Sequence, residues 1–343
     1  MSAPLLAVDG LCTHFFTKAG VVKAVDGVSF TVARGEVLGL VGESGAGKSM
    51  TGYSIMGLID PPGRVVSGVI ELNGRDLSAL SAEDMRQLRG NRIAMIFQDP
   101  MMTLNPVLRI DVQMVETILA HEKVTRRTAL GRARAALVKV GIPSPDERLQ
   151  AYPHQFSGGM RQRVAIAIAL LNNPDLIIAD EPTTALDVTI QGQILFEMQK
   201  LTRETGAAMI WITHDLSVIA GLADRVCVMY AGRIVEQGTT FDVLTHPWHP
   251  YTQGLLDSVP ARGARGQRLT QIPGMTPSVL ELPPGCAFRE RCRYATEECT
   301  VNPAMRDLGV EGRGVRCFHP LLAGRAPRAG AGPRGAPAEG APA

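Results

Sequence analysis

The chain has 343 residues, of which 45% are hydrophobic and 20% are charged, so it can bury a core and is not expected to be disordered as a whole. Its formal net charge of +2 gives no long-range electrostatic reason to expect a nucleic-acid partner. No apolar run approaches the roughly 20 residues of a membrane span, and the N-terminus lacks a basic segment followed by a signal-type apolar core, so we expect a cytoplasmic protein.

The first 80 residues are predicted to be rich in β-strand, and they contain the most specific motif of the chain. An apolar run at Val37–Val41 predicts a buried strand, and a helix is predicted to begin near Lys48. Between them, residues 42–49 read Gly-Glu-Ser-Gly-Ala-Gly-Lys-Ser, which is a complete G-x-x-x-x-G-K-[ST] motif. A strand, a glycine loop and a helix in this order predict a phosphate-binding loop.

The residue types of this loop explain how it would hold a nucleotide. Glycines let the backbone curl so that successive amides point at phosphate oxygens, and the helix N-terminus adds partial positive charge. Lys48 is expected to reach the β- and γ-phosphates, and the Ser49 hydroxyl to ligate Mg²⁺. The residues expected to contact ATP are Gly42, Glu43, Ser44, Gly45, Ala46, Gly47, Lys48 and Ser49.

A helical insert is predicted next, with helices over residues 107–121 and 126–140. It leads to Phe-Ser-Gly-Gly-Met-Arg-Gln-Arg at 156–163, which precedes a helical stretch. Ser157 is a suitable N-cap, and Gly158 and Gly159 leave the backbone amides uncovered. The segment therefore predicts a second anion site at a helix N-terminus.

A second apolar strand, from Leu176, ends in two carboxylates, Asp180 and Glu181. An aspartate at such a strand end holds Mg²⁺ in phosphate-loop proteins, which is the role expected of Asp180. Glu181 is one residue further on, and it is a candidate general base for the attacking water.

Two phosphate sites in one chain are understandable if the loop of one copy and the helix of another close on the same ATP. In this the chain resembles the ATP-binding cassette (ABC) ATPases over about residues 5–245. The resemblance implies that Phe15, or the adjacent Phe16, stacks on adenine. The signature departs from the common family form at Phe156 and Met160, but its serine and glycines are present, so we expect it to be active.

Further roles follow from the same resemblance. It implies that Gln98 is the Q-loop glutamine, which contacts Mg²⁺ and reports nucleotide occupancy to the helical insert. Asp187 matches the D-loop, and His214 matches the switch histidine that contacts the γ-phosphate. The catalytic set implied is thus Glu181, His214 and Gln98.

The C-terminal part changes in character, with many prolines and four cysteines, Cys286, Cys292, Cys299 and Cys317. Disulfides are not expected in a reducing cytoplasm, so clustered thiolates favour a metal site. The spacing differs from that of common zinc ribbons and suits a four-cysteine iron–sulfur cluster, but by itself it does not decide between iron–sulfur and zinc. Cys12 and Cys227, which stand alone in strand-like contexts, are predicted to be ordinary buried thiols.

Resemblance narrows these alternatives. His-Pro-Tyr-Thr at 249–252 and the first two clustered cysteines are similar to the C-terminal extension of the dipeptide/oligopeptide/nickel subfamily of bacterial ABC importers. Members of that subfamily can carry a [4Fe–4S] cluster on four such cysteines. The resemblance also implies a second ABC ATPase subunit, two transmembrane permease subunits, an extracytoplasmic solute-binding protein, and a position at the cytoplasmic face of the bacterial inner membrane.

The fold class expected is α/β: a phosphate-loop ABC ATPase core with an N-terminal antiparallel β subdomain, a helical insert at about 99–160 and a C-terminal Cys-rich extension. The domains expected are 5–245, 246–320 and a disordered tail at 321–343. The function implied is ATP hydrolysis that powers import of peptides or related small solutes. The alternatives are a soluble ABC-type ATPase that acts on nucleic acid, which usually has long coiled coils or a second cassette, and a redox or iron sensor. Because every phosphate-holding motif precedes residue 215, ATPase activity is expected to be largely independent of the cysteines.

Overall fold

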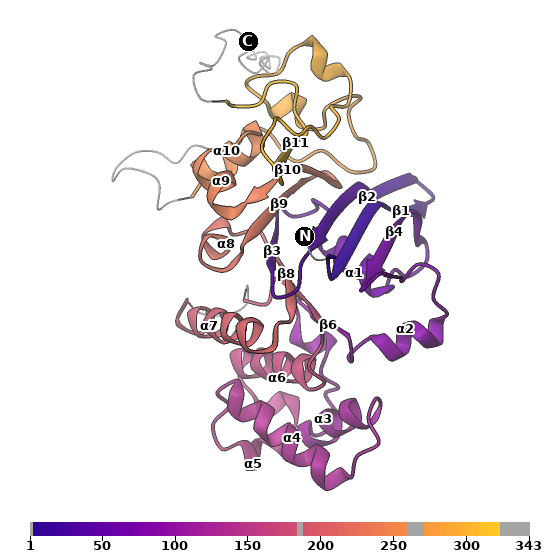
Figure 1. Ribbon diagram of the computed structural model, residues 1–343, viewed down its shortest axis with the longest axis vertical. Helices are drawn as coiled ribbons and strands as arrows, with labels where there is room; N and C mark the ends of the chain where they lie inside the picture. The colour runs from indigo at the N-terminus through magenta and orange to yellow at the C-terminus, as the bar shows by residue number, and fades with distance from the viewer. Residues whose placement is uncertain (1–2, 184–187, 260–270, 323–343) are drawn as a thin grey trace, which may run out of the picture.

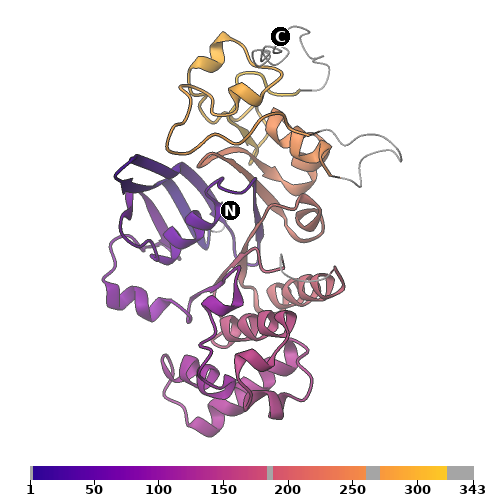
Figure 2. The ribbon, with the colours of Figure 1, turned by 180° about the vertical axis from the view of Figure 1, so that it is seen from behind.

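The computed structural model describes residues 3–183, 188–259 and 271–322. The predicted D-loop residue Asp187 and positions 323–343 of the predicted tail lie outside these ranges. In the described part of the chain, no helix has the length and apolar character needed to cross a membrane. Figure 1 shows an elongated molecule in which the helical insert and the C-terminal extension lie at opposite ends, and Figure 2 shows the same arrangement from behind.

Two sheets form the framework, and the described strands pair in the orders β2-β1-β4-β5 and β11-β10-β9-β3-β8-β7-β6. The first is antiparallel, as predicted for the N-terminal part. The second is parallel from β9 through β6 and has an antiparallel edge at β10 and β11. The strands are β1 Leu6–Thr17, β2 Gly20–Val32, β3 Val37–Val41, β4 Gly63–Leu72, β5 Arg75–Asp76, β6 Ile93–Ile96, β7 Leu176–Asp180, β8 Ala208–Thr213, β9 Arg225–Tyr230, β10 Arg233–Thr239 and β11 Gly314–Val315.

Helices cover the larger sheet and form the insert. The predicted helices at 107–121 and 126–140 are present as α3 and α4, and they lie at the end of the molecule farthest from the C-terminal extension (Figure 1). The α-helices are α1 Lys48–Met56, α2 Ala82–Leu88, α3 Ile110–Leu119, α4 Arg126–Lys139, α5 Pro145–Leu149, α6 Gly158–Leu170, α7 Val188–Thr205, α8 Leu216–Leu222, α9 Thr240–Thr245 and α10 Pro250–Asp257. Short 3₁₀ turns are η1 Pro100–Met102, η2 Pro153–Gln155, η4 Arg289–Arg291 and η5 Glu297–Thr300.

The strand β3 carries the phosphate loop and is buried over its whole length. Its alternate residues enter two different cores, because successive side chains of a strand point to opposite faces. Leu38 and Leu40 pack with α1 and the antiparallel sheet, whereas Val37 and Val41 pack in the core that includes the helical insert. The loop that follows β3 is therefore fixed to both halves of the cassette.

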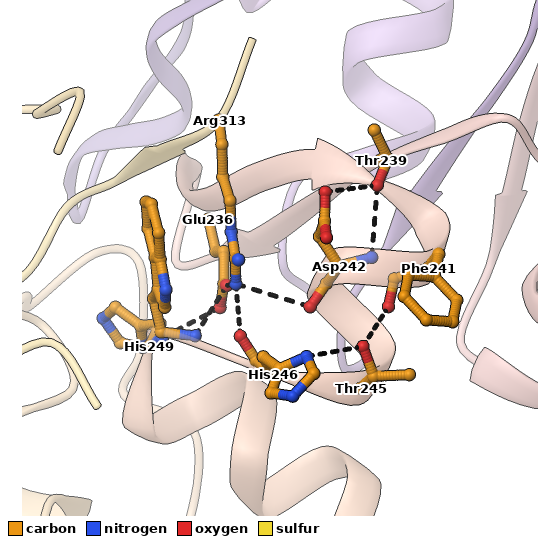
Figure 3. Close-up of polar contacts among 9 residues, drawn as sticks. Glu236, Thr239, Phe241, Asp242, Thr245, His246, His249 and Arg313 are labelled. Carbon is orange, nitrogen blue, oxygen red and sulfur yellow. Dashed lines mark hydrogen bonds and ion pairs between the residues drawn. The ribbon is translucent and has the colours of Figure 1, made fainter. Parts of the chain in front are cut away.

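The C-terminal extension joins the cassette sheet, because its strand β11 pairs with β10. A buried carboxylate fixes this junction: Glu236 on β10 accepts hydrogen bonds from the backbone amides of Trp248 (2.7 Å) and His249 (2.8 Å). The buried guanidinium of Arg313 lies 3.5 Å from the Glu236 carboxylate and also donates to the His246 carbonyl (Figure 3). The extension continues past residue 320, since the Leu321 amide donates to the Trp248 carbonyl.

Replacing Glu236 with glutamine should lower the free energy of unfolding by about 3–5 kcal/mol, because it leaves the buried Arg313 charge without its partner. Urea unfolding followed by fluorescence measures the change. Glu311→Gln is the matched control, an exposed glutamate two residues from Arg313 whose replacement should stay within about 0.5 kcal/mol. Equal stability of the two variants would show that the ion pair does not fix the junction.

Candidate functional site

The phosphate loop joins the end of β3 to the start of α1, as its sequence predicts. Two of its glycines are required by close backbone approaches. A Cβ on Gly42 would lie 2.2 Å from the Met229 carbonyl oxygen, and one on Gly47 would lie 2.3 Å from that of Ala24. Both glycines also have positive φ values, 157° and 100°, so a larger residue would force the loop apart.

Lys48 lies inside the loop. Its ammonium donates to the carbonyl oxygens of Gly42 (2.8 Å) and Glu43 (3.0 Å), and the residue is 5% exposed. Burial lowers the pKa of Lys48, while the nearby carboxylates of Glu181, Asp180 and Glu43 act in the opposite direction. These carboxylates favour the charged amine, so the loop presents a buried cation beside its amides, which suits an anionic phosphate.

The residues predicted to hold Mg²⁺ are brought together. The hydroxyl of Ser49 donates to a carboxylate oxygen of Asp180 at 2.9 Å, across a sequence separation of 131 residues. Burial raises the pKa of Asp180, and the hydrogen bond from Ser49 opposes this effect. A hydroxyl and a buried carboxylate side by side are the oxygen donors that Mg²⁺ prefers, so these residues fit the metal.

The three predicted catalytic side chains also meet. Glu181 follows β7, and its two carboxylate oxygens lie 3.3 Å from the Gln98 amide nitrogen and 3.2 Å from His214 Nδ1. The backbone of Glu181 has a φ of 44°, which is uncommon for a residue with a side chain and typical of functional sites. All three line a cavity of about 930 Å³ together with the phosphate loop.

The signature segment lies elsewhere in the molecule. Ser157 caps α6, and its hydroxyl accepts a hydrogen bond from the Met160 amide at 3.3 Å. Ser157 and Gly158 are exposed, and neither they nor Gly159 line the cavity of the phosphate loop. The helix N-terminus predicted to bind phosphate is therefore available to a different molecule rather than to its own loop.

The two phenylalanines considered for stacking on adenine, Phe15 and Phe16, lie next to each other on β1. The Phe15 ring packs against Gly63, and Phe16 is 41% exposed beneath the guanidinium of Arg64. Neither phenylalanine lines the cavity of the phosphate loop. Stacking by Phe15 stays a prediction.

Sequence reasoning missed that the C-terminal extension reaches the phosphate loop. Three residues of the extension form hydrogen bonds with Glu43: Thr276, Tyr251 on α10, and Arg291 on η4. Ile272 and Gly274 of the same extension line the nucleotide cavity. Tyr251 and Arg291 do lie in or beside the segments that indicated the extension, but nothing in the sequence pairs them with a glutamate more than 200 residues earlier.

The four clustered cysteines converge as predicted. Cys286, Cys292, Cys299 and Cys317 line one small cavity beside α10. Burial raises the pKa of Cys292 and of Cys317 to about 12, and the neighbouring thiols contribute in the same direction.

No three of the four clustered cysteine sulfurs lie all within 4.8 Å of one another. Among the described residues, the only three His, Cys, Asp or Glu donor atoms found within 4.8 Å of one another belong to Cys12, His14 and Asp26, and Asp26 is already paired with Arg233.

The other two cysteines differ from each other. Cys227 is fully buried, as predicted. Cys12 is only partly buried, which corrects the prediction, because its sulfur lies at a bulge of β1 where it accepts a hydrogen bond from the Gly27 amide.

Comparisons with known proteins agree with this site. Residues 25–184 match the family "ABC transporter", and residues 235–299 match "Oligopeptide/dipeptide transporter, C-terminal region". Among solved structures, the ATP-binding cassette MJ0796 bound to ADP and Pi in a dimeric post-hydrolysis state is 25% identical, with a TM-score of 0.63. The similarity covers 68% of this chain and 98% of that one.

Curated relatives are similar over nearly the whole chain. The dipeptide transport ATP-binding protein DppD of Bacillus subtilis is 52% identical over 94% of this chain and 98% of its own length. DppD of Escherichia coli is 46% identical over 92% and 97%, and the oligopeptide transport ATP-binding protein OppD of the same species is 46% identical over 92% and 94%. The chain belongs to the ABC transporter family of ATPases, among the dipeptide and oligopeptide transport ATP-binding proteins.

Proposed function

We propose that the chain is the ATP-hydrolysing subunit of a bacterial importer for dipeptides, oligopeptides or related small solutes. The observation that carries the proposal is the meeting of Gln98, Glu181 and His214 at the phosphate-loop cavity of a chain that also has the peptide-transporter extension. The whole-length similarity to transport proteins disfavours the nucleic-acid ATPase and the sensor.

In the mechanism we infer, two cassettes close on two ATP molecules. Lys48 and the loop amides bind the phosphates, while Ser157 and Gly159 of the facing cassette complete the shell. Glu181 accepts the proton of the attacking water, and His214 orients the γ-phosphate. Ser49, Asp180 and Gln98 would hold Mg²⁺, which supplies charge neutralisation at the phosphate oxygens when bound. Hydrolysis lets the cassettes separate, so nucleotide state sets the closed or open form.

The partners we propose are a second ABC ATPase subunit and two transmembrane permeases that receive solute from an extracytoplasmic binding protein. The second ATPase is either another copy of this chain or a paralogue, and the subfamily resemblance favours the paralogue. Two exposed apolar side chains near the start of the helical insert support a permease contact: Met102 is 70% exposed and Val107 is 75% exposed. They follow Gln98 closely, so this contact would be linked to the nucleotide site. The chain would then lie at the cytoplasmic face of the inner membrane.

Affinity purification of the tagged chain from its native membranes tests these partners. We expect two permeases and an ATPase subunit to co-purify, and Met102→Asp with Val107→Asp to reduce their recovery. Recovery of nucleic acid or ribosomal proteins in place of permeases would favour the nucleic-acid alternative.

We also propose that Cys286, Cys292, Cys299 and Cys317 hold a [4Fe–4S] cluster with a structural or redox-sensing role. The support is their convergence on one cavity of the segment that matches the oligopeptide/dipeptide transporter C-terminal region, together with a spacing in sequence that suits a four-cysteine cluster.

Anaerobically purified protein should therefore be brown and contain about four iron and four acid-labile sulfide atoms per chain. Serine at any one of the four positions should bleach the colour and make residues 280–320 more sensitive to protease, because ligation supplies folding free energy to this proline-rich segment. Cys227→Ser changes a cysteine outside the cluster and is the control. It should keep the brown colour and the protease resistance of residues 280–320. Colourless protein with one zinc atom would refute the cluster and leave the ATPase assignment unaffected.

A further inference from the structure

The C-terminal extension holds the phosphate loop through one buried arginine. Arg291 ends the turn η4, and its side chain is only 6% exposed. Its guanidinium donates to both carboxylate oxygens of Glu43, at 2.7 and 3.0 Å. Such a bidentate, charge-assisted pair fixes orientation as well as distance.

The guanidinium is itself held in place. It donates to the carbonyl of Pro273 (3.0 Å) and to the hydroxyls of Tyr230 and Thr276 (3.3 Å each), and it lies 5.8 Å from the centre of the Tyr230 ring. The geometry of the Arg291–Glu43 pair is therefore set by groups of the extension and of β9 rather than by solvent.

The backbone of Glu43 is also held by hydrogen bonds. Its amide donates to the hydroxyl of Tyr251 at 2.8 Å, and its carbonyl accepts from Lys48 at 3.0 Å. Tyr251 is fully buried, with its ring 4.6 Å from that of Tyr230. An unbroken series of contacts thus runs from the extension through Glu43 to the lysine of the phosphate loop.

Arg291 also stands directly among the cysteines. The turn that carries it begins after Cys286 and ends at Cys292, and it is closed by hydrogen bonds from the Arg289 amide to the Cys286 carbonyl (2.9 Å) and from the Cys292 amide to the Arg289 carbonyl (3.2 Å). Displacement of either cysteine would move the guanidinium.

We propose that Arg291 is a positioning residue that pre-organises the phosphate loop through Glu43, so that the order of the cysteine segment sets the affinity for nucleotide. The inference rests on the proposed function, in which this loop binds ATP. Arg291 lines the cavity of the phosphate loop, but its guanidinium is bound to Glu43. A loop held in its binding shape loses less conformational freedom when phosphate binds, so releasing it weakens binding.

Fluorescence titration with a ribose-labelled ATP analogue measures the effect. Arg291→Gln should raise Kd by about 5- to 150-fold, the usual range of coupling between sites. Arg291→Lys keeps the positive charge but not the paired donors of the guanidinium, so its Kd should lie between those of the wild type and Arg291→Gln. Arg293→Gln, an exposed arginine on the other side of Cys292, is the matched control and should bind as the wild type does.

Two further readouts separate positioning from a purely structural role. In steady-state hydrolysis, KM should rise with little change in kcat, because the Arg291–Glu43 pair acts on nucleotide binding rather than on the reacting atoms. The double variant Glu43→Gln with Arg291→Gln should bind no more weakly than the weaker single variant. Normal affinity in Arg291→Gln and Glu43→Gln, or additive losses in the double variant, would overturn the proposal.

The link to the cysteines is tested with Cys292→Ser. It should weaken nucleotide binding to the same extent as Arg291→Gln, and combining the two should add nothing. Normal affinity in Cys292→Ser would refute this link. Failure of the ATP-binding role on which this inference rests would look different, since the wild-type chain itself would then not bind the analogue.

Discussion

Glu181→Gln is expected to bind ATP with nearly the wild-type affinity and to hydrolyse it about 10²–10⁴-fold more slowly. Glutamine keeps the size of the side chain and can still contact Gln98 and His214, but it cannot accept the proton of the attacking water. Single-turnover hydrolysis gives the rate and analogue binding gives the affinity, both measured on the same preparation with its partner subunit. The variant should also accumulate in the closed, ATP-bound dimer.

Glu290→Gln is the control for this experiment, since that glutamate is exposed and lies outside the cavity. It should hydrolyse ATP at the wild-type rate. Turnover within about threefold of wild type in Glu181→Gln would assign the proton transfer to another group, because general-base catalysis contributes at least about a hundredfold.

Lys48→Ala should weaken ATP binding by about tenfold to a hundredfold and should also lower kcat. The estimate follows from the loss of a charged hydrogen bond, about 1.5–3 kcal/mol, at a buried position among the loop carbonyls. Isothermal titration with ATP gives the change in affinity.

The matched substitution for Lys48→Ala is Lys200→Ala, which removes an exposed lysine paired only loosely with Glu204 at 4.0 Å. It should leave affinity unchanged, as isolated surface ion pairs contribute little. If the two variants bound ATP equally well, the phosphate loop would not be the nucleotide site.

Much of the fold follows from local sequence. The apolar runs that form β3, β7 and β8 are bounded by polar or glycine residues, and such runs specify buried strands with little help from the rest of the chain. The meeting of Ser49 with Asp180 and of Glu181 with His214 was also predictable, because the carboxyl ends of parallel strands share one edge of a sheet.

The contacts of the extension could not be predicted in the same way. Arg291 and Glu43 are 248 residues apart, and an arginine between two cysteines gives no local signal of its partner. The expectation that the cysteines and the ATPase are independent rested on where the motifs lie in sequence. That expectation stays a prediction, but Tyr251 of α10 and Arg291 of η4 contact the loop, and only the three-dimensional structure shows this link.

The central claim, that ATP hydrolysis by this chain drives solute import, is tested most directly by uptake into proteoliposomes. The vesicles contain the two permeases and both ATPase subunits, ATP is enclosed on the cassette side, and a labelled dipeptide is added outside with the binding protein. We expect ATP-dependent accumulation of the peptide, which Glu181→Gln abolishes and Glu290→Gln leaves intact. Rapid ATP hydrolysis by the assembled complex with no accumulation of any dipeptide, oligopeptide or nickel complex would contradict it.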